Sequence, residues 1–442
     1  MTKRHYLLVG IGILFLGLAI IQVVVSTALP VPPQTAMLPD GHSLSLERVD
    51  FGTRLEFGSR WSALATRWLP KGLLRKLGIK TGTTLHDGKP AVGIWLVYDG
   101  SVKKFGHRME FLVGDDSGYF GGRSWRTMQR DYGSSNHTII GIALESFPRR
   151  SRKIRLGAFL PDKSWNRELV AEFLIDNPIY GTSLPVWPAE VLPVSRVTNG
   201  LEITLNRLAF GVGSARVFKG DSREYDPRAL ATFTVTTNGV LTKDWKPDAV
   251  IMTDATGNER KQGSWGSNWR EMTNYFQWAP TLWPDTGGMR FRFEFTRGTK
   301  AAFATNELLV LRSLVVPTNT AVTELQLVTN MFGHHVRVLG LAGKNGRFTN
   351  HHRSTSGELT LEVVVDPPML DKQIDLIAGK DEKGRKVDVG GASWSRDSGR
   401  YSFRVEPHNQ AEELDLTLAV HESVYVNFVV EPEMLKPVET GK

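Results

Sequence analysis

Cysteine is absent from this chain of 442 residues. Its absence excludes disulfide bonds, thiolate catalysis, zinc sites built on Cys and a lipoprotein signal. The sequence also lacks a Gly-rich phosphate loop, a His-Glu-x-x-His pair and a Gly-x-Ser-x-Gly motif. We therefore assign no catalytic, cofactor-binding or metal-binding residues. A carboxylate pair for glycoside hydrolysis leaves no linear trace, so these absences argue against an enzyme without excluding one.

Low-complexity segments are also missing, and the composition is that of globular protein. Apolar residues make up 41% of the chain, and 43 Gly and 22 Pro supply breaks for many short strands. A chain of this length exceeds one hydrophobic core and predicts about three domains. The net charge of +8 is modest for this length.

The N-terminus carries the one long apolar segment. Lys3 and Arg4 precede an uncharged stretch from Tyr6 to Val25, and a helix of about 20 residues spans the hydrocarbon core of a bilayer. We predict a signal anchor over residues 1–28, with a cytoplasmic N-terminus and the bulk of the chain extracytoplasmic. The alternative is a secretory signal cleaved near Ala28, which gives a secreted or periplasmic protein.

A strand pattern with a Phe-Gly ending recurs along the chain. It occurs at Leu44–Gly52 and Ile203–Gly211, and more loosely at Leu325–Gly333. Repetition of this kind is typical of an array of similar modules.

Other features recur after that strand in a fixed order. They are an Asp-x-x-Gly turn, a Ser-Trp pair, a Pro, and an alternating strand such as Met289–Phe295 followed by a further strand and Pro. We predict an all-β protein of three tandem antiparallel β-sandwiches. The modules resemble immunoglobulin or fibronectin-type domains in size and texture, without the Cys pair of true immunoglobulins.

The predicted boundaries follow from these features. They are a Pro-rich spacer at 29–39, module 1 at 40–178, a linker at 179–199, module 2 at 200–317, module 3 at 321–432, and a frayed tail at 433–442. Proline stiffens the links, which favours a rod or a compact stack.

Residues 59–80 interrupt module 1 with a different texture. Trp and Leu recur near helical spacing among basic residues, and no acid occurs in the stretch. We interpret the segment as a helical insertion that packs on its own module. The alternative is a helix that lies on an anionic membrane surface.

The Ser-Trp pairs contain Trp125, Trp265 and Trp394. We expect these rings to fill the gap between two sheets, because large aromatic side chains suit that space. A ligand-stacking platform is the alternative.

Two other residue types are candidates for metal binding. Asp115, Asp254 and Asp381 are predicted to form turns, and calcium at Asp115 and Asp116 is the less favoured reading because too few oxygens are present. The adjacent pairs His334–His335 and His351–His352 cannot chelate as pairs on a strand, although one His from each could share a metal.

Basic residues cluster at the turn between Arg149 and Arg155. The cluster fits either a charged strand edge that prevents aggregation or a surface for an anionic partner. We favour the edge.

The sequence therefore predicts a membrane-anchored, extracytoplasmic scaffold with a structural or adhesive role. Its predicted partners are the membrane, through the N-terminal helix, and an envelope polysaccharide or another protein; nucleic acid is not expected. The alternatives are a carbohydrate-binding array, suggested by Trp269, Trp278 and Trp283, and a glycoside-type hydrolase.

Overall fold

The computed structural model describes most of the chain from Ser26 onwards. The described ranges are 26–29, 34–57, 83–100, 109–123, 126–131, 138–161, 167–211, 228–263, 266–268, 274–278, 282–283, 287–298, 301–317, 321–343, 359–369, 372–395, 398–408 and 410–434. This part is nearly all strand, arranged in antiparallel sheets that are consistent with β-sandwiches. None of its helices is long and apolar enough to cross a bilayer, and the predicted span from Tyr6 to Val25 lies outside it.

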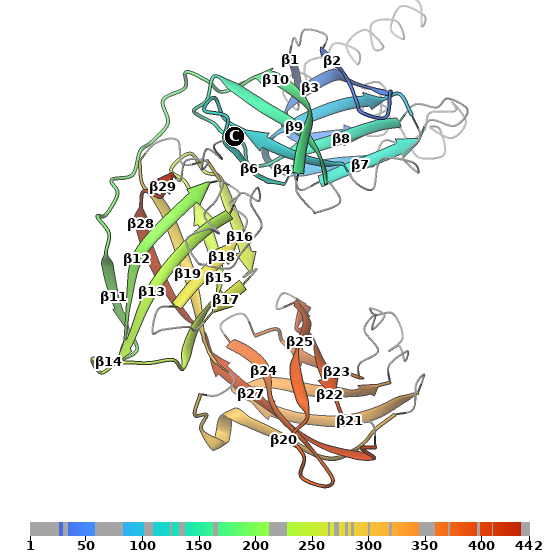
Figure 1. The fold of residues 1–442 in the computed structure, drawn as a ribbon, viewed down its shortest axis with the longest axis vertical. Coiled ribbons are helices and arrows are strands. Elements are labelled where there is room, and N and C mark those ends of the chain that lie inside the picture. Colours follow the sequence, from blue (N-terminus) through green and yellow to red (C-terminus); the bar gives the residue numbers. More distant parts are fainter. Residues whose placement is uncertain are drawn as a thin grey trace, which may run out of the picture.

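The sheets fall into three lobes, which Figure 1 shows from top to bottom. Lobe 1 has a sheet in the order β1-β3-β4-β8-β7, with β2 also beside β3, and a second sheet in the order β10-β9-β5-β6. Its strands are β1 (Ser26–Leu29), β2 (Gln34–Met37), β3 (Ser43–Phe57), β4 (Thr83–Tyr98), β5 (Glu110–Gly114), β6 (Phe120–Arg123), β7 (Arg126–Asp131), β8 (Thr138–Leu144), β9 (Lys153–Pro161) and β10 (Arg167–Asp176).

Lobe 2 repeats this arrangement with an 11-residue β12 in the place of β3. One sheet runs β11-β12-β13-β18-β17, with β14 beside β13 and β29 beside β12, and the other runs β16-β15-β19-β28. Its strands are β11 (Val194–Thr198), β12 (Leu201–Gly211), β13 (Arg228–Thr237), β14 (Val240–Leu241), β15 (Trp245–Thr253), β16 (Glu259–Gly263), β17 (Gly266–Asn268), β18 (Asn274–Trp278), β19 (Met289–Arg297), β28 (Val424–Val430) and β29 (Glu433–Met434).

Lobe 3 pairs a sheet in the order β20-β27-β24 with one in the order β21-β22-β23-β26-β25. A short 3-10 helix, η2, precedes β20. The bounds are η2 (Thr305–Glu307), β20 (Leu308–Val315), β21 (Val322–Met331), β22 (His334–Ala342), β23 (Leu359–Asp366), β24 (Lys372–Asp381), β25 (Asp388–Ser395), β26 (Arg400–Glu406) and β27 (Glu413–Glu422).

Alternation along the strands builds the core. In β19 the side chains of Phe291, Phe293 and Phe295 are fully buried, whereas Arg290 and Arg292 face solvent. This confirms the period-two pattern from Met289 to Phe293, beyond which Glu294 and Thr296 on the opposite face are buried as well. Most buried apolar side chains of lobes 1 and 2 form one contact cluster, a smaller cluster around Trp95 lies within lobe 1, and lobe 3 has a cluster of its own.

The repeated opening strand is present in all three lobes. Leu44 pairs with Tyr98, Ile203 with Val235, and Val336 with Val365. In each lobe a β-bulge follows the residue two positions after the first member of this pair. These residues are Leu46, Leu205 and Val338. A bulge at one shared position bends the strand in the same way in each lobe.

The third copy lies at a different place from the predicted one. Phe332 and Gly333 form the turn between β21 and β22, with φ angles of 53° and 80°. Asn199 and Gly200 occupy the corresponding turn of lobe 2, also with positive φ. The prediction at Leu325–Gly333 was therefore wrong, because a hairpin turn reproduces the Phe-Gly letters without the strand geometry.

Lobe 3 is inserted into lobe 2: its strands, β20 to β27, are consecutive in the chain and lie between β19 and β28 of lobe 2. In lobe 1, β10 follows β9 directly and pairs with it. The strand after β19 is β20, but it pairs with β27 of lobe 3, and β19 pairs instead with β28. The predicted boundaries at 317 and 432 assign each of these two strands to the neighbouring module, because local pattern does not specify a pairing partner.

Three shorter segments also differ from the predicted boundaries. Residues 34–37 of the predicted spacer form β2, and residues 194–198 of the predicted linker form β11. Glu433 and Met434 of the predicted frayed tail pair with β12 as β29. Each segment completes the edge of a sheet, where main-chain hydrogen bonds outweigh weak local propensity. The insertion at 59–80 lies outside the described residues.

Candidate functional site

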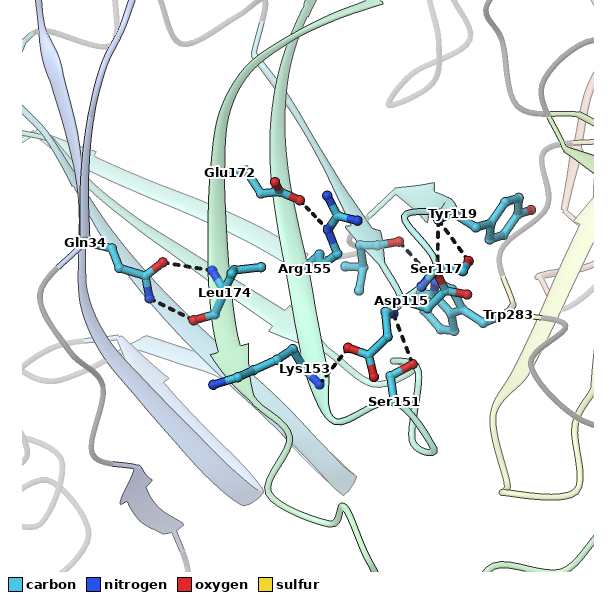
Figure 2. Close-up of polar contacts among 12 residues, drawn as sticks. Gln34, Asp115, Ser117, Tyr119, Ser151, Lys153, Arg155, Glu172, Leu174 and Trp283 are labelled. Atoms are coloured by element: carbon cyan, nitrogen blue, oxygen red, sulfur yellow. Dashed lines mark hydrogen bonds and ion pairs between the residues drawn. The ribbon is translucent and has the colours of Figure 1, made fainter. Parts of the chain in front are cut away.

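The three Asp-x-x-Gly segments form one turn geometry. Asp115 Oδ1 accepts hydrogen bonds from Ser117 N at 3.0 Å and Tyr119 N at 3.0 Å, and Gly118 has a φ of 85°. Asp254 Oδ1 accepts the equivalent pair from Thr256 N and Asn258 N, and Asp381 Oδ1 accepts it from Lys383 N and Arg385 N. These contacts confirm the prediction that the aspartates form turns. Figure 2 shows the turn at Asp115.

The carboxylate of Asp116 also accepts hydrogen bonds from the main chain. Its carboxylate accepts main-chain hydrogen bonds from Arg152 N at 2.5 Å and Lys153 N at 3.1 Å. Among the described residues no group of His, Asp and Glu is arranged to hold a metal ion. The carboxylates considered for calcium are thus engaged with N–H donors in the structure.

Most of the basic cluster makes contacts within the protein. Lys153 Nζ lies 2.5 Å from Asp176 Oδ1. Arg155 Nε lies 2.5 Å from Glu172 Oε1, a pair that Figure 2 shows. Lys153 and Arg155 lie on β9, which has β10 on one side and β5 on the other. β9 is therefore an interior strand, and the interpretation of the cluster as a strand-edge charge was wrong.

Arg149 and Arg150 lie where lobes 1 and 2 meet, a contact region that we call the joint. Arg149 Nε donates to Asn258 Oδ1 at 3.1 Å, and its guanidinium stacks 4.9 Å from the Phe147 ring. Burial lowers the pKa of Arg149, and nearby Asp254 opposes this effect. Arg150 donates to the main-chain carbonyls of residues 184 and 185, in the segment that leads into lobe 2.

Asn258 is the centre of this joint. Its side chain accepts from Phe147 N at 3.3 Å and donates to Phe147 O at 2.9 Å, although only 1% of the residue is exposed. Trp283 Nε1 adds a hydrogen bond of 3.1 Å to Val113 O. A sequence signal for Asn258 existed and was missed, because this residue follows the Asp254 turn directly and the turn motif sets its place.

A second cluster of polar residues lies where lobes 2 and 3 meet. Arg297, at the end of β19, forms an ion pair with Glu307 of η2 and stacks 4.7 Å from the Phe303 ring. Burial raises the pKa of Glu307, but hydrogen bonds from Arg297 and Ala304 N outweigh it and hold the pKa below its ordinary value. His421 is fully buried, and its Nε2 lies 2.9 Å from Asp375 Oδ2.

The tryptophans are only partly described. Trp125, Trp265 and Trp269 lie outside the described residues, and for Trp394 only the main chain, in β25, is described. Trp278 and Trp283 are 0% and 3% exposed. These last two rings are therefore part of the core and do not form the stacking surface considered from the sequence.

The histidine pairs are not brought into a shared site within the described chain. His334 Nδ1 lies 2.7 Å from Pro367 O, and His335 is exposed. His351 and His352 lie outside the described residues.

Comparison with known proteins adds little. No family model matches the chain, and no curated protein matches it. A marsupial T cell receptor among the solved structures is similar with a TM-score of 0.12 and 9% identity, over 76% of this chain and 94% of the receptor chain. A likeness of this size carries no argument about function.

Proposed function

We propose that the protein is a membrane-anchored, extracytoplasmic scaffold of three immunoglobulin- or fibronectin-like sandwiches, without a catalytic role. The observation that carries the proposal is the insertion of lobe 3 into lobe 2. Because β28 of lobe 2 follows lobe 3 in the chain, two chain connections join these lobes, one from β19 to β20 and one from β27 to β28. A double connection restricts relative movement more than a single flexible linker does, which suits a scaffold.

The joint between lobes 1 and 2 supports the same function. Hydrogen bonds between the Asn258 side chain and Phe147, and between Trp283 and Val113, tie the lobes together at two points. Buried polar contacts of this type cost free energy when broken, because their groups lose partners away from water. Together with the two chain connections between lobes 2 and 3, these contacts support a fixed arrangement of the three lobes.

The register of β1 supports an uncleaved anchor. Ser26 pairs with Gly52 and Leu29 with Val49, directly after the predicted membrane span. Cleavage after Ala28 would remove three of the four residues of this strand. We therefore favour retention of residues 1–28, with the membrane as the first partner and the lobes outside the cell.

Spin-label distances test the rigidity. Because the chain has no cysteine, labels can be placed in pairs at Arg152→Cys, Val240→Cys and Arg337→Cys, one exposed position in each lobe. We expect a narrow distance distribution for every pair, and broad distributions would contradict a scaffold. Protease treatment of intact cells, followed by N-terminal sequencing, tests topology: digestion from outside and an intact residue 28–29 bond are expected.

A further inference from the structure

The outward face of the four-stranded sheet of lobe 2 carries a group of exposed cations. Arg290 and Arg292 alternate with buried phenylalanines on β19 and are exposed. Ile251 of β15 pairs with Arg292 and with Lys261 of β16, so the exposed Lys261 lies on the same face. We call Arg290, Arg292 and Lys261 the arginine face. It belongs to the middle lobe in Figure 1.

Aromatic rings hold the two guanidinium groups in place. Arg290 Cζ lies 4.7 Å from the centroid of the Trp187 ring, and Arg292 Cζ lies 4.4 Å from that of Tyr425. A guanidinium over a ring face gains cation–π energy and loses side-chain freedom. Its N–H donors lie in the guanidinium plane and stay available for a carboxylate or phosphate, which arginine binds through two parallel hydrogen bonds.

Within the described part of the chain, none of these three cations forms an ion pair. Three acidic residues occupy the same sheet. Glu294 is only 2% exposed, and Asp248 lies at the bulge of β15 next to Ala249, the residue that pairs with Glu294. Glu259 is separated from Arg290 by Thr253, a distance of about 10 Å across two strand spacings. The exposed face therefore keeps an excess of positive charge.

The equivalent position in the other lobes is neutralised. Arg290 pairs with Thr253, the residue just before the turn aspartate Asp254. The residues that pair in the same way in the other lobes are Arg155, opposite Gly114 in lobe 1, and Asp415, opposite Lys380 in lobe 3. Arg155 forms an ion pair with Glu172, and Asp415 forms one with Lys380 at 3.4 Å. In lobe 2 the position of Glu172 is taken by Asn427, which pairs with Arg292 and carries no charge.

We propose that the arginine face binds an acidic polysaccharide of the cell envelope. A flat sheet face suits an extended polymer, whereas a small ligand needs a concave site. Alternate residues on a strand lie roughly 7 Å apart, so the two guanidinium groups can contact successive charged groups along one chain. Lobe 1 separates this face in chain order from the membrane anchor, which favours a polymer over lipid headgroups. The choice of polysaccharide over nucleic acid rests on the proposed export.

Binding by the full-length protein in neutral detergent tests the proposal. The probe is immobilised polygalacturonate, with dextran as the uncharged polymer, and single-stranded DNA and vesicles with 30% anionic lipid as competitors. The Arg290→Gln/Arg292→Gln variant should bind polygalacturonate at least tenfold more weakly. The matched control is Arg312→Gln/Arg337→Gln, which removes the same charge from exposed positions on lobe 3 and should bind as wild type does.

A second variant keeps both arginines. Asn427→Glu places a carboxylate where lobe 1 has Glu172, so it should neutralise the arginine face and weaken binding to the same degree. Equal loss in the lobe 3 control, unchanged binding in Asn427→Glu, or tighter binding to DNA or vesicles than to polygalacturonate would each overturn the proposal. These outcomes are independent of protease accessibility in cells, so a failure here leaves the scaffold topology standing.

Discussion

Phe428→Ala distinguishes the insertion of lobe 3 into lobe 2 from a simple tandem arrangement. Phe428 is fully buried on β28, 6.3 Å from the Phe293 ring of lobe 2. Removal of a buried phenylalanine side chain costs about 3–5 kcal/mol, from lost burial and from the cavity left behind. This is a large part of the roughly 5–15 kcal/mol that stabilises a typical domain. We therefore expect selective destabilisation of lobe 2.

Hydrogen–deuterium exchange with mass spectrometry measures where the loss falls. In Phe428→Ala, amide protection should decrease in β15 and β19 and stay unchanged in β24 and β27. Leu416→Ala on β27, also fully buried, is the matched control and should have the opposite distribution. In a simple tandem arrangement β28 would complete lobe 3. Loss of protection in β24 and β27 with an unchanged β19 would thus refute the assigned pairing.

The remaining predictions concern the two joints. Asn258→Ala removes both hydrogen bonds to Phe147 and should lower the free energy of unfolding by about 1–3 kcal/mol in denaturant titrations. Asn330→Ala, at an exposed position, is the control. Equal stability of the two variants would contradict a stabilising contact between Asn258 and Phe147. Glu307→Gln should destabilise the protein at pH 7, and the difference from wild type should shrink as the pH falls below 4.5. The folded-state pKa of Glu307 lies below the ordinary 4.5, so its contribution is present above that pH and is lost as the pH falls through the folded value. A pH-independent difference in urea unfolding would argue against the ion pair.

Much of the fold followed from local pattern. The alternation from Met289 to Phe295 specified which face of β19 is buried, and the three Asp-x-x-Gly segments specified three identical turns. Both features depend on residues close together in the sequence. The period of the side chains and the positive φ of glycine are enough to predict them.

Pairing partners could not be predicted in this way. β20 and β28 are both apolar strands that follow an alternating strand, so their sequences fit either neighbour equally well. The joint at Asn258 and the stacking of Arg290 on Trp187 also bring together residues far apart in the chain. Three-dimensional placement decides these contacts, and no linear spacing encodes them.

Disulfide formation between β19 and β28 tests the insertion of lobe 3 into lobe 2 most directly. Arg290 and Val429 pair across the two strands, and directly opposed residues have Cβ atoms about 5 Å apart. In a protein without other cysteines, Arg290→Cys/Val429→Cys should form an intramolecular disulfide under mild oxidation, seen as a faster-migrating band without reductant. Two free thiols that persist in the folded, oxidised protein would show that β28 does not complete lobe 2.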